Sequence, residues 1–390
     1  MKIAGIKTYV AGRIRKLRAR MRDNKLDAII IIDPADVSYL TGFSGDDSVL
    51  LISQHRKVLV TDSRYVIQAR EECPGLAMKV RKGGMSAVVG EVMESWGLAA
   101  SGTSRKKLPI IGIDPNTITA AALKAYRKAV GRGLRLNSGL VGELRQCKDD
   151  FEVEQIRKAV RIAETALKET LKSIKPGVTE LEVAAELEYE MARRGGRPAA
   201  FESIVAFGAH GAQPHARPGR GRLGKNQSIL IDWGATVGGY RSDLTRCFSV
   251  GKILPAFVDV YQWVLEAQLA AIEEVRPGVE FVQVDRAARD VLERRLKSTK
   301  LRPIRGLDWK KAVYEHGTGH GLGLNIHEAP TLSKQSKGVL KEGMVVTIEP
   351  GFYIPGRFGI RIEDDVLVTR KGRTLLSRLG KDLNTVTLYM

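Results

Sequence analysis

The sequence contains few cysteines and no long hydrophobic run near its basic amino terminus. Its three cysteines, Cys73, Cys147 and Cys247, are far apart and odd in number, which argues against a disulfide framework and a thiolate metal site. Reduced thiols are the expectation for a cytoplasmic protein. The longest apolar run of the amino-terminal region, residues 28–32, is too short for a membrane span or a signal-peptide core. We therefore expect a cytoplasmic protein that has no membrane partner.

Acidic residues are scarce relative to basic ones. The chain has 63 lysines and arginines against 44 aspartates and glutamates, which gives a net charge of +19. Such an excess can indicate nucleic-acid binding. The basic residues are nevertheless dispersed, with small groups at 13–22 and 217–225, and aromatic residues do not alternate with them. We expect a generally basic surface and no nucleic-acid partner.

The chain is long enough, at 390 residues, for two domains that each bury a core. The first, residues 1–140, shows alternating helix and strand patterns that predict an α/β domain. Its two predicted helices and three predicted strands lie at residues 7–22 and 118–130, and at 28–32, 49–53 and 58–61. A glycine-rich and charged passage, residues 131–150, marks a boundary. The second domain is expected to span residues 148–390 and to begin with a long amphipathic helix.

An internal repeat lies within this second domain. KPGVTELEV (175–183) follows the first long helix, and RPGVEFVQV (276–284) follows another predicted at 258–275. Each PGV turn introduces a further helix, and the first of these begins with a predicted capping box of Thr179 and Glu182. Strand-like segments follow each helix pair. Two similar halves predict a pseudo-twofold α+β domain whose strands meet in the middle.

Three of the six histidines, His316, His320 and His327, lie in EHGTGHGLGLNIHE (315–328). A histidine pair at i, i+4 often presents two zinc ligands on a helix. The alternating glycines disfavour a helix here, because each costs about 1 kcal/mol in a helix interior. We expect an extended segment that passes close to a bound group, with its histidines projecting into a cavity.

Four acids at the ends of apolar strand segments provide partners for these histidines. They are Asp232, Asp243, Glu349 and Glu363, and a predicted hairpin turn at residues 238–239 separates the first two. An acid in an apolar strand is costly unless it is paired or bound to metal. Together with His320 they predict an oxygen-rich cation site, and this many anionic ligands would overcompensate one ion. We expect two divalent ions, with manganese first and cobalt, zinc or iron as alternatives.

Five segments of the second domain together resemble the pita-bread-fold metallopeptidase family, which includes creatinase, prolidases, methionine aminopeptidases and aminopeptidase P. They are PHARP (214–218), DWGATVGGYRSDLTR (232–246), HGTGHGLGLNIHE (316–328), TIEPGFY (347–353) and GIRIEDD (359–365). TGFSGDDSVLLIS (41–53) and TDSRYVIQA (61–69) resemble the amino-terminal domain of bacterial Xaa-Pro aminopeptidases. The resemblance implies an α+β protein: a pseudo-twofold pita-bread catalytic domain preceded by a smaller α/β creatinase-type domain.

The resemblance also implies roles for individual residues. It assigns the same five metal ligands, with Asp243 and Glu363 bridging the two ions: Asp232, Asp243, His320, Glu349 and Glu363. It implies that substrate contacts come from His215, His316 and His327, and that the catalytic groups are His215, His327 and Glu349. Thr245 and Arg361 are implied to hold the ligand carboxylates from behind.

The hypothesis that follows is a metallo-aminopeptidase that hydrolyses the Xaa-Pro bond and releases the first residue of peptides with proline second. One alternative is an Xaa-Pro dipeptidase, or prolidase, and another is a non-catalytic binding protein on the same fold. Asp46 and Asp47 depart from the aminopeptidase P pattern after TGFSG, which leaves the preferred peptide length open. A homodimer is a further expectation from the family.

Overall fold

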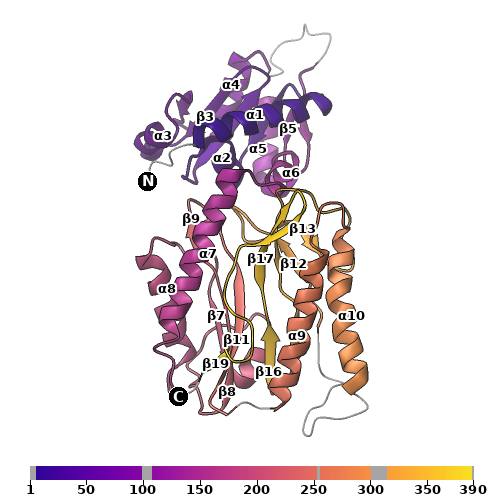
Figure 1. Ribbon diagram of the computed structural model, residues 1–390. Helices are drawn as coiled ribbons and strands as arrows, with labels where there is room; N and C mark the ends of the chain where they lie inside the picture. The colour runs from indigo at the N-terminus through magenta and orange to yellow at the C-terminus, as the bar shows by residue number, and fades with distance from the viewer. Residues whose placement is uncertain (1–5, 99–107, 253–254, 300–313, 389–390) are drawn as a thin grey trace. The chain divides into compact units, whose positions relative to one another are not determined.

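The computed structural model describes residues 6–98, 108–252, 255–299 and 314–388. The chain forms two compact units, Met1–Arg145 and Gln146–Met390, and Figure 1 labels the elements of each. Each unit is described by itself below.

The first unit is built on a six-stranded sheet with the strand order β4-β3-β2-β1-β5-β6. β1 pairs antiparallel with β2 and parallel with β5, and β2 pairs antiparallel with β3, as the sequence predicts for that strand pair. The elements in chain order are α1 (Ile6–Asp23), β1 (Ala28–Ile31), α2 (Pro34–Thr41), β2 (Ser48–Ser53), β3 (Lys57–Thr61), η1 (Ser63–Tyr65), α3 (Val66–Glu72), β4 (Met78–Val80), α4 (Met85–Ser95), β5 (Ile111–Ile113), η2 (Pro115–Thr117), α5 (Ala120–Val130), β6 (Leu134–Leu136) and α6 (Leu140–Gln146).

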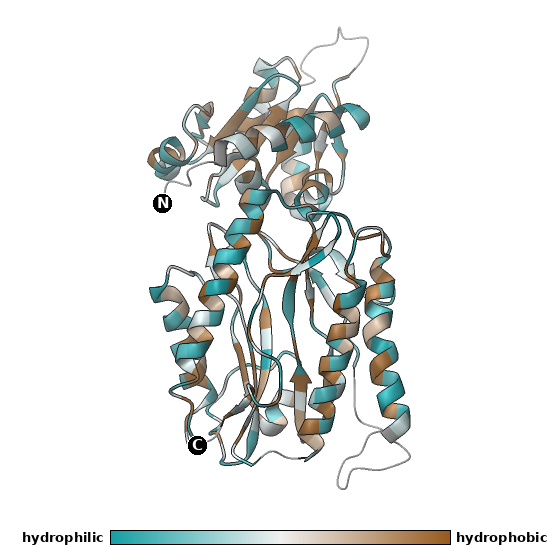
Figure 2. Ribbon diagram, in the orientation of Figure 1, coloured by the Kyte–Doolittle hydropathy of each residue, from teal (hydrophilic) through white to brown (hydrophobic). Residues whose placement is uncertain are grey.

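Hydrophobic periodicity explains both kinds of element in this unit. Helix α1 buries Ile14, Leu17 and Met21, which recur at helical spacing on one face, while β1 is buried along its whole length. Figure 2 shows the strands of this sheet as hydrophobic segments. Helix α5 begins two residues later than predicted, because the side chain of Thr119 caps it and Ile118 is extended.

The second unit contains two helix pairs with strands between them (Figure 1). Its larger sheets have the orders β19-β11-β8-β7 and β13-β12-β14-β17-β18. The elements are α7 (Asp150–Thr170), α8 (Glu180–Arg193), β7 (Ile204–Phe207), η3 (Gly208–Ala212), β8 (Gln227–Trp233), β9 (Thr236–Val237), β10 (Tyr240–Arg241), β11 (Leu244–Val250), α9 (Pro255–Glu274), α10 (Phe281–Thr299), β12 (Gly319–Gly321), β13 (Glu328–Leu332), β14 (Val345–Ile348), β15 (Gly351–Ile354), β16 (Phe358–Arg361), β17 (Asp364–Thr369), β18 (Gly372–Leu375) and β19 (Thr387–Leu388).

The internal repeat predicted from the two PGV turns is present in the backbone hydrogen bonds. The amide of Gly177 donates to the carbonyl of Leu223, and in the second half the amide of Gly278 donates to the carbonyl of Leu340, each at 2.8 Å. Both glycines have a positive φ, 96° and 86°, which other residues rarely adopt. The predicted capping box of Thr179 is also formed. The pseudo-twofold α+β architecture is therefore confirmed.

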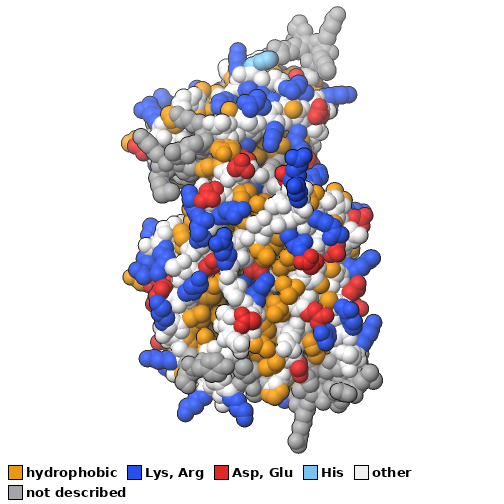
Figure 3. Space-filling model, viewed as in Figure 1, with side chains coloured by type: hydrophobic (Ala, Val, Ile, Leu, Met, Phe, Trp, Pro, Cys, Tyr) orange, Lys and Arg blue, Asp and Glu red, His pale blue; other side chains and the backbone are white. Residues whose placement is uncertain are grey.

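The surface agrees with the dispersed charge pattern of the sequence. Figure 3 shows lysine and arginine side chains scattered over the visible face, with acidic side chains among them. Within the described part of the chain, no helix combines the length and the hydrophobicity that a membrane crossing requires.

Candidate metal centre

Four acids reach the middle of the second unit from the ends of its strands. Asp232 lies near the end of β8, Asp243 directly precedes β11, Glu349 directly follows β14 and Glu363 directly precedes β17. An isolated bridge between Thr245 and Glu363 joins the strands of the two halves at this point. The hairpin predicted at residues 238–239 lies between β9 and β10, where both glycines have positive φ.

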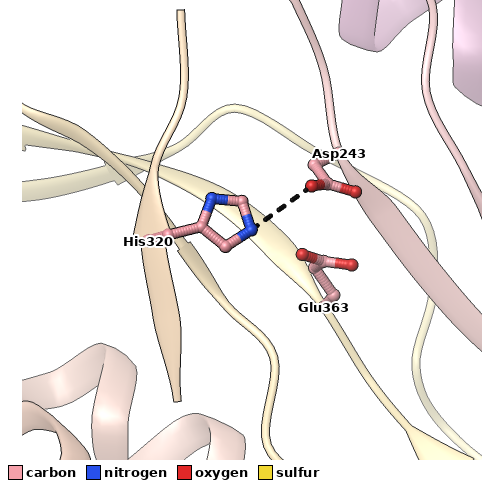
Figure 4. Close-up of side chains that lie close together, drawn as sticks. All are labelled: Asp243, His320 and Glu363. Atoms are coloured by element: carbon pink, nitrogen blue, oxygen red, sulfur yellow. Dashed lines mark ion pairs between the residues drawn. The ribbon is translucent and has the colours of Figure 1, made fainter. Parts of the chain in front are cut away.

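His320 faces this group of acids. Its Nε2 atom lies 3.6 Å from Asp243 Oδ2 and 3.3 Å from Glu349 Oε1. One potential ligand atom from each of Asp243, His320 and Glu363 lies within 4.8 Å of the other two. Figure 4 shows the imidazole pointing toward both carboxylates, with the ion pair to Asp243 dashed. These atoms are close enough to share a cation.

The electrostatics of the acids indicate that they need a cation. Burial and the nearby charge of Glu363 raise the pKa of Asp243 well above its usual range. Burial and the charge of Glu349 do the same to the pKa of Glu363. Asp232 Oδ1 is buried and has no hydrogen-bond partner among the residues that the structure describes. Because buried carboxylates this close repel each other, divalent cations would stabilise the whole group, and the residues present fit such ions.

The tautomer of His320 suits a metal ligand. Its Nδ1 lies 3.1 Å from the carbonyl oxygen of Gly321, which can only accept a hydrogen bond. Nδ1 therefore carries a proton, which leaves Nε2, the ring nitrogen that faces the acids, as the atom that could bind a metal.

Arg361 and Thr245 fix two of the carboxylates by hydrogen bonds. Arg361 Nη2 donates to Asp232 Oδ2 at 2.6 Å, and its Nε donates to Thr245 Oγ1 at 3.2 Å. The hydroxyl of Thr245 in turn donates to Glu363 Oε2 at 2.6 Å. One arginine thus fixes acids from both halves of the unit, directly on one side and through a threonine on the other.

A cavity of about 700 Å³ opens onto the acids. Its lining includes His215, His316 and His327, the three histidines expected to meet substrate. Burial lowers the pKa of His327, and the nearby charge of His320 lowers it further. The ring of His327 lies edge-on to that of His320, with 4.5 Å between their centres.

His316 differs from the other two histidines because both of its ring nitrogens are bonded to the protein. Nδ1 donates to the carbonyl of Gly317 at 2.8 Å, so Nε2 must accept from the hydroxyl of Tyr353 at 2.9 Å. Tyr353 also accepts from Arg361 Nη1 at 2.7 Å. His316 lines the cavity, but its polar atoms turn toward this network. The sequence analysis did not identify Tyr353 as a site residue. Its position in the motif TIEPGFY could have indicated it.

The glycines around His320 were expected to let the backbone pass close to a bound group, and the close neighbour that the structure shows is another strand. A Cβ atom on Gly319 would lie 1.9 Å from the carbonyl oxygen of Thr347 on the neighbouring strand. The close contact is thus with protein backbone, which places His320 beside the end of β14 and its acid.

Asp46 and Asp47, the two acids that depart from the aminopeptidase P pattern, have partners within the first unit. Asp47 Oδ2 pairs with Arg64 at 2.9 Å and with Arg81 at 2.8 Å. Asp46 accepts a hydrogen bond from the hydroxyl of Tyr65. Both acids therefore have a local structural use.

Comparisons with known proteins agree with this geometry. Residues 154–370 match the model of metallopeptidase family M24, and residues 13–147 match that of the creatinase/prolidase N-terminal domain. An Xaa-Pro dipeptidase from Bacillus anthracis is 33% identical, with a TM-score of 0.87 over 97% of this chain and 100% of that one. An X-Pro aminopeptidase from Thermotoga maritima is 31% identical, with a TM-score of 0.82 over 95% and 100%. The putative dipeptidase YkvY of Bacillus subtilis is 31% identical over 95% of this chain and 99% of its own. The chain therefore belongs to metallopeptidase family M24, and it carries the creatinase/prolidase type of amino-terminal domain.

Proposed function

We propose that this protein is a divalent-metal-dependent Xaa-Pro dipeptidase of the prolidase type. The observation that carries the proposal is the group of ligand atoms from Asp243, His320 and Glu363, within 4.8 Å of one another beside a cavity of about 700 Å³. A cavity of this size is in the range of small-ligand sites, which suits a dipeptide.

The sequence favoured an aminopeptidase P activity, and we now prefer the alternative, an Xaa-Pro dipeptidase. Dipeptidase names prevail among the similar proteins, and the Bacillus anthracis enzyme is described as an Xaa-Pro dipeptidase. The X-Pro aminopeptidase from Thermotoga maritima shares the same fold, so its activity is the outcome that the substrate assay must distinguish. A cytoplasmic location and a homodimer stay predictions from the family, and size-exclusion chromatography with light scattering tests the latter.

Five residues would hold the two proposed divalent ions: Asp232, Asp243, His320, Glu349 and Glu363. When bound, such ions lower the pKa of water and polarise a carbonyl group, so that a peptide bond can be hydrolysed near neutral pH. Manganese is the ion we expect first, with cobalt, zinc and iron as the other candidates.

The chain's own residues would orient the substrate and move the proton. Glu349, beside His320, takes the proton of the attacking water and passes it to the proline nitrogen. His327 and His215 face the cavity and donate hydrogen bonds to the carbonyl oxygen as it gains negative charge. His316, with both ring nitrogens engaged, shapes the cavity wall and supports Arg361 through Tyr353.

Metal content and activity of two matched variants test the proposal. Asp243→Asn should lose bound metal and lower kcat/KM for an Xaa-Pro dipeptide by more than about 100-fold, because it removes the negative charge of a carboxylate that would bind the metal. Asp290→Asn changes an exposed aspartate on α10 and should leave both measurements unchanged. Full activity of Asp243→Asn would contradict the metal mechanism.

A further inference from the structure

Glu180, the first residue of α8, is a buried acid outside the metal centre. It is 2% exposed, and its carboxylate accepts hydrogen bonds from three residues of the segment 207–219. Oε1 accepts from the amide of Phe207 at 2.8 Å and from His210 Nδ1 at 2.8 Å. Oε2 accepts from the amide of Gly219 at 2.9 Å, and His210 Nδ1 lies 2.9 Å from it as well.

These bonds close a loop that carries one of the cavity histidines. Phe207 ends β7, and residues 208–219, which we name the His215 loop, follow directly. The carboxylate of Glu180 binds the residue before the loop and the last residue of the loop. The middle of the loop lines the cavity with His215 and its neighbours. There, Arg361 Nη1 donates to the carbonyl of Pro214 at 3.3 Å.

The internal repeat shows that the fold does not require an acid at this position. In the first half, the amide of Glu180 donates to the carbonyl of Gly221 at 3.2 Å. In the second half, the amide of Phe281 donates to the carbonyl of Gly338 at 3.1 Å, so Phe281 is the equivalent of Glu180. The PGV turn and the helix start thus form equally well with an apolar side chain.

A buried carboxylate is costly unless its oxygens accept hydrogen bonds. Glu180 meets this requirement with the two loop amides and His210, and its place in the first turn of α8 adds a favourable interaction with the helix dipole. The hydrogen bonds to the loop therefore explain why a buried acid is tolerated at position 180. The equivalent residue of the second half, Phe281, packs instead against Gly338.

We propose that Glu180 is a positioning residue that fixes both ends of the His215 loop and thereby holds His215 at its place in the cavity. The inference rests on the proposed peptidase function, in which His215 contacts substrate. Glu180 touches neither substrate nor metal ligand and acts through His215.

Glu180→Gln tests this role with little change of shape. A glutamine side chain has a single oxygen, so either the amide of Phe207 or that of Gly219 loses its acceptor. We expect kcat/KM for an Xaa-Pro dipeptide to fall by about 10- to 100-fold with unchanged metal content, because misplacing a group that orients substrate has an effect of this order. His210→Ala, which removes one donor from a partly exposed position, should cause a smaller fall.

Glu182→Ala is the matched control on the same helix. Glu182 is exposed and its carboxylate contacts only Thr179 among the hydrogen bonds of the described residues, so this variant weakens the helix start without touching the loop. It should keep full activity. An equal fall in activity for Glu182→Ala and Glu180→Gln would show that only helix stability matters and would overturn the proposal.

A double-mutant cycle with His215→Ala separates positioning from a general structural effect. If Glu180 acts through His215, adding Glu180→Gln to His215→Ala should cause no further loss of kcat/KM, whereas independent losses would contradict the proposal. If the wild-type protein cleaves no dipeptide, the proposed function fails, yet hydrogen exchange still tests the loop. Glu180→Gln should then accelerate exchange of the amide of residue 207 or of residue 219, and unchanged exchange of both would refute the role of Glu180.

Discussion

Replacing Arg246 by methionine should strongly destabilise the second unit, which contains the candidate metal centre. The guanidinium is 1% exposed and donates to Asp364 Oδ1 at 2.7 Å, to the carbonyl of Glu363 at 2.6 Å and to that of Leu379 at 3.1 Å. Methionine fills much of the volume but donates no hydrogen bond. Removing one partner of a buried ion pair costs about 3–5 kcal/mol. Because about 1 kcal/mol shifts the Tm of a unit of this size by about 2–4 °C, we expect a loss of about 6–20 °C.

Differential scanning calorimetry of matched variants measures this effect. Arg161→Met is the control, because Arg161 pairs with Glu154 at 3.0 Å on the surface, where the two side chains are 59% and 47% exposed. Such a surface pair contributes at most about 1 kcal/mol. If Arg246→Met lowered the Tm of its unit no more than Arg161→Met does, the reasoning about the buried pair would be refuted.

Three further predictions concern stability and activity. Burial would raise the pKa of Asp364, but the charges of Arg246 and Lys381, with hydrogen bonds from Lys381 and Ser377, together outweigh it and bring the pKa to about 2, below the unfolded value. The stability that this acid contributes, about 2 kcal/mol, should be complete above about pH 4 and be lost as the pH falls toward about 2, and urea unfolding of wild type and Asp364→Asn across this range checks it. Tyr353→Phe removes the donor to His316 and should lower kcat/KM about 10-fold with metal content retained; an unchanged rate would exclude a role for that hydroxyl. Thr179→Ala should lower the stability of α8 by about 1 kcal/mol in calorimetry without loss of activity, since it removes only the helix cap.

The parts of the fold that depend on local sequence were predictable. The PGV turns need glycine at positive φ, and the capping box of Thr179 involves residues three positions apart, so both can be read without a structure. The acids of the centre were predictable for a chemical reason, because an acid that ends an apolar strand requires a compensating charge.

The parts that depend on long-range contacts were not predictable. His316 is indistinguishable by residue type and spacing from His320, and only the fold shows that Tyr353 and the carbonyl of Gly317 occupy its ring nitrogens. Glu180 reads in the sequence as an ordinary first-turn acid of a helix, although it contacts Gly219, far along the chain. The start of α5 was misplaced because Thr119 competes with Ile118 as the helix boundary.

The most direct test of the central claim compares initial rates on an Xaa-Pro dipeptide and on the matching Xaa-Pro-Yaa tripeptide, for protein loaded with Mn²⁺ and for the same protein after chelation. We predict that the loaded protein cleaves the dipeptide with the higher kcat/KM, and that chelation abolishes this activity until Mn²⁺ is restored. Cleavage of the tripeptide alone would contradict the dipeptidase assignment, and dipeptide cleavage that survives removal of the metal would contradict the metal centre itself.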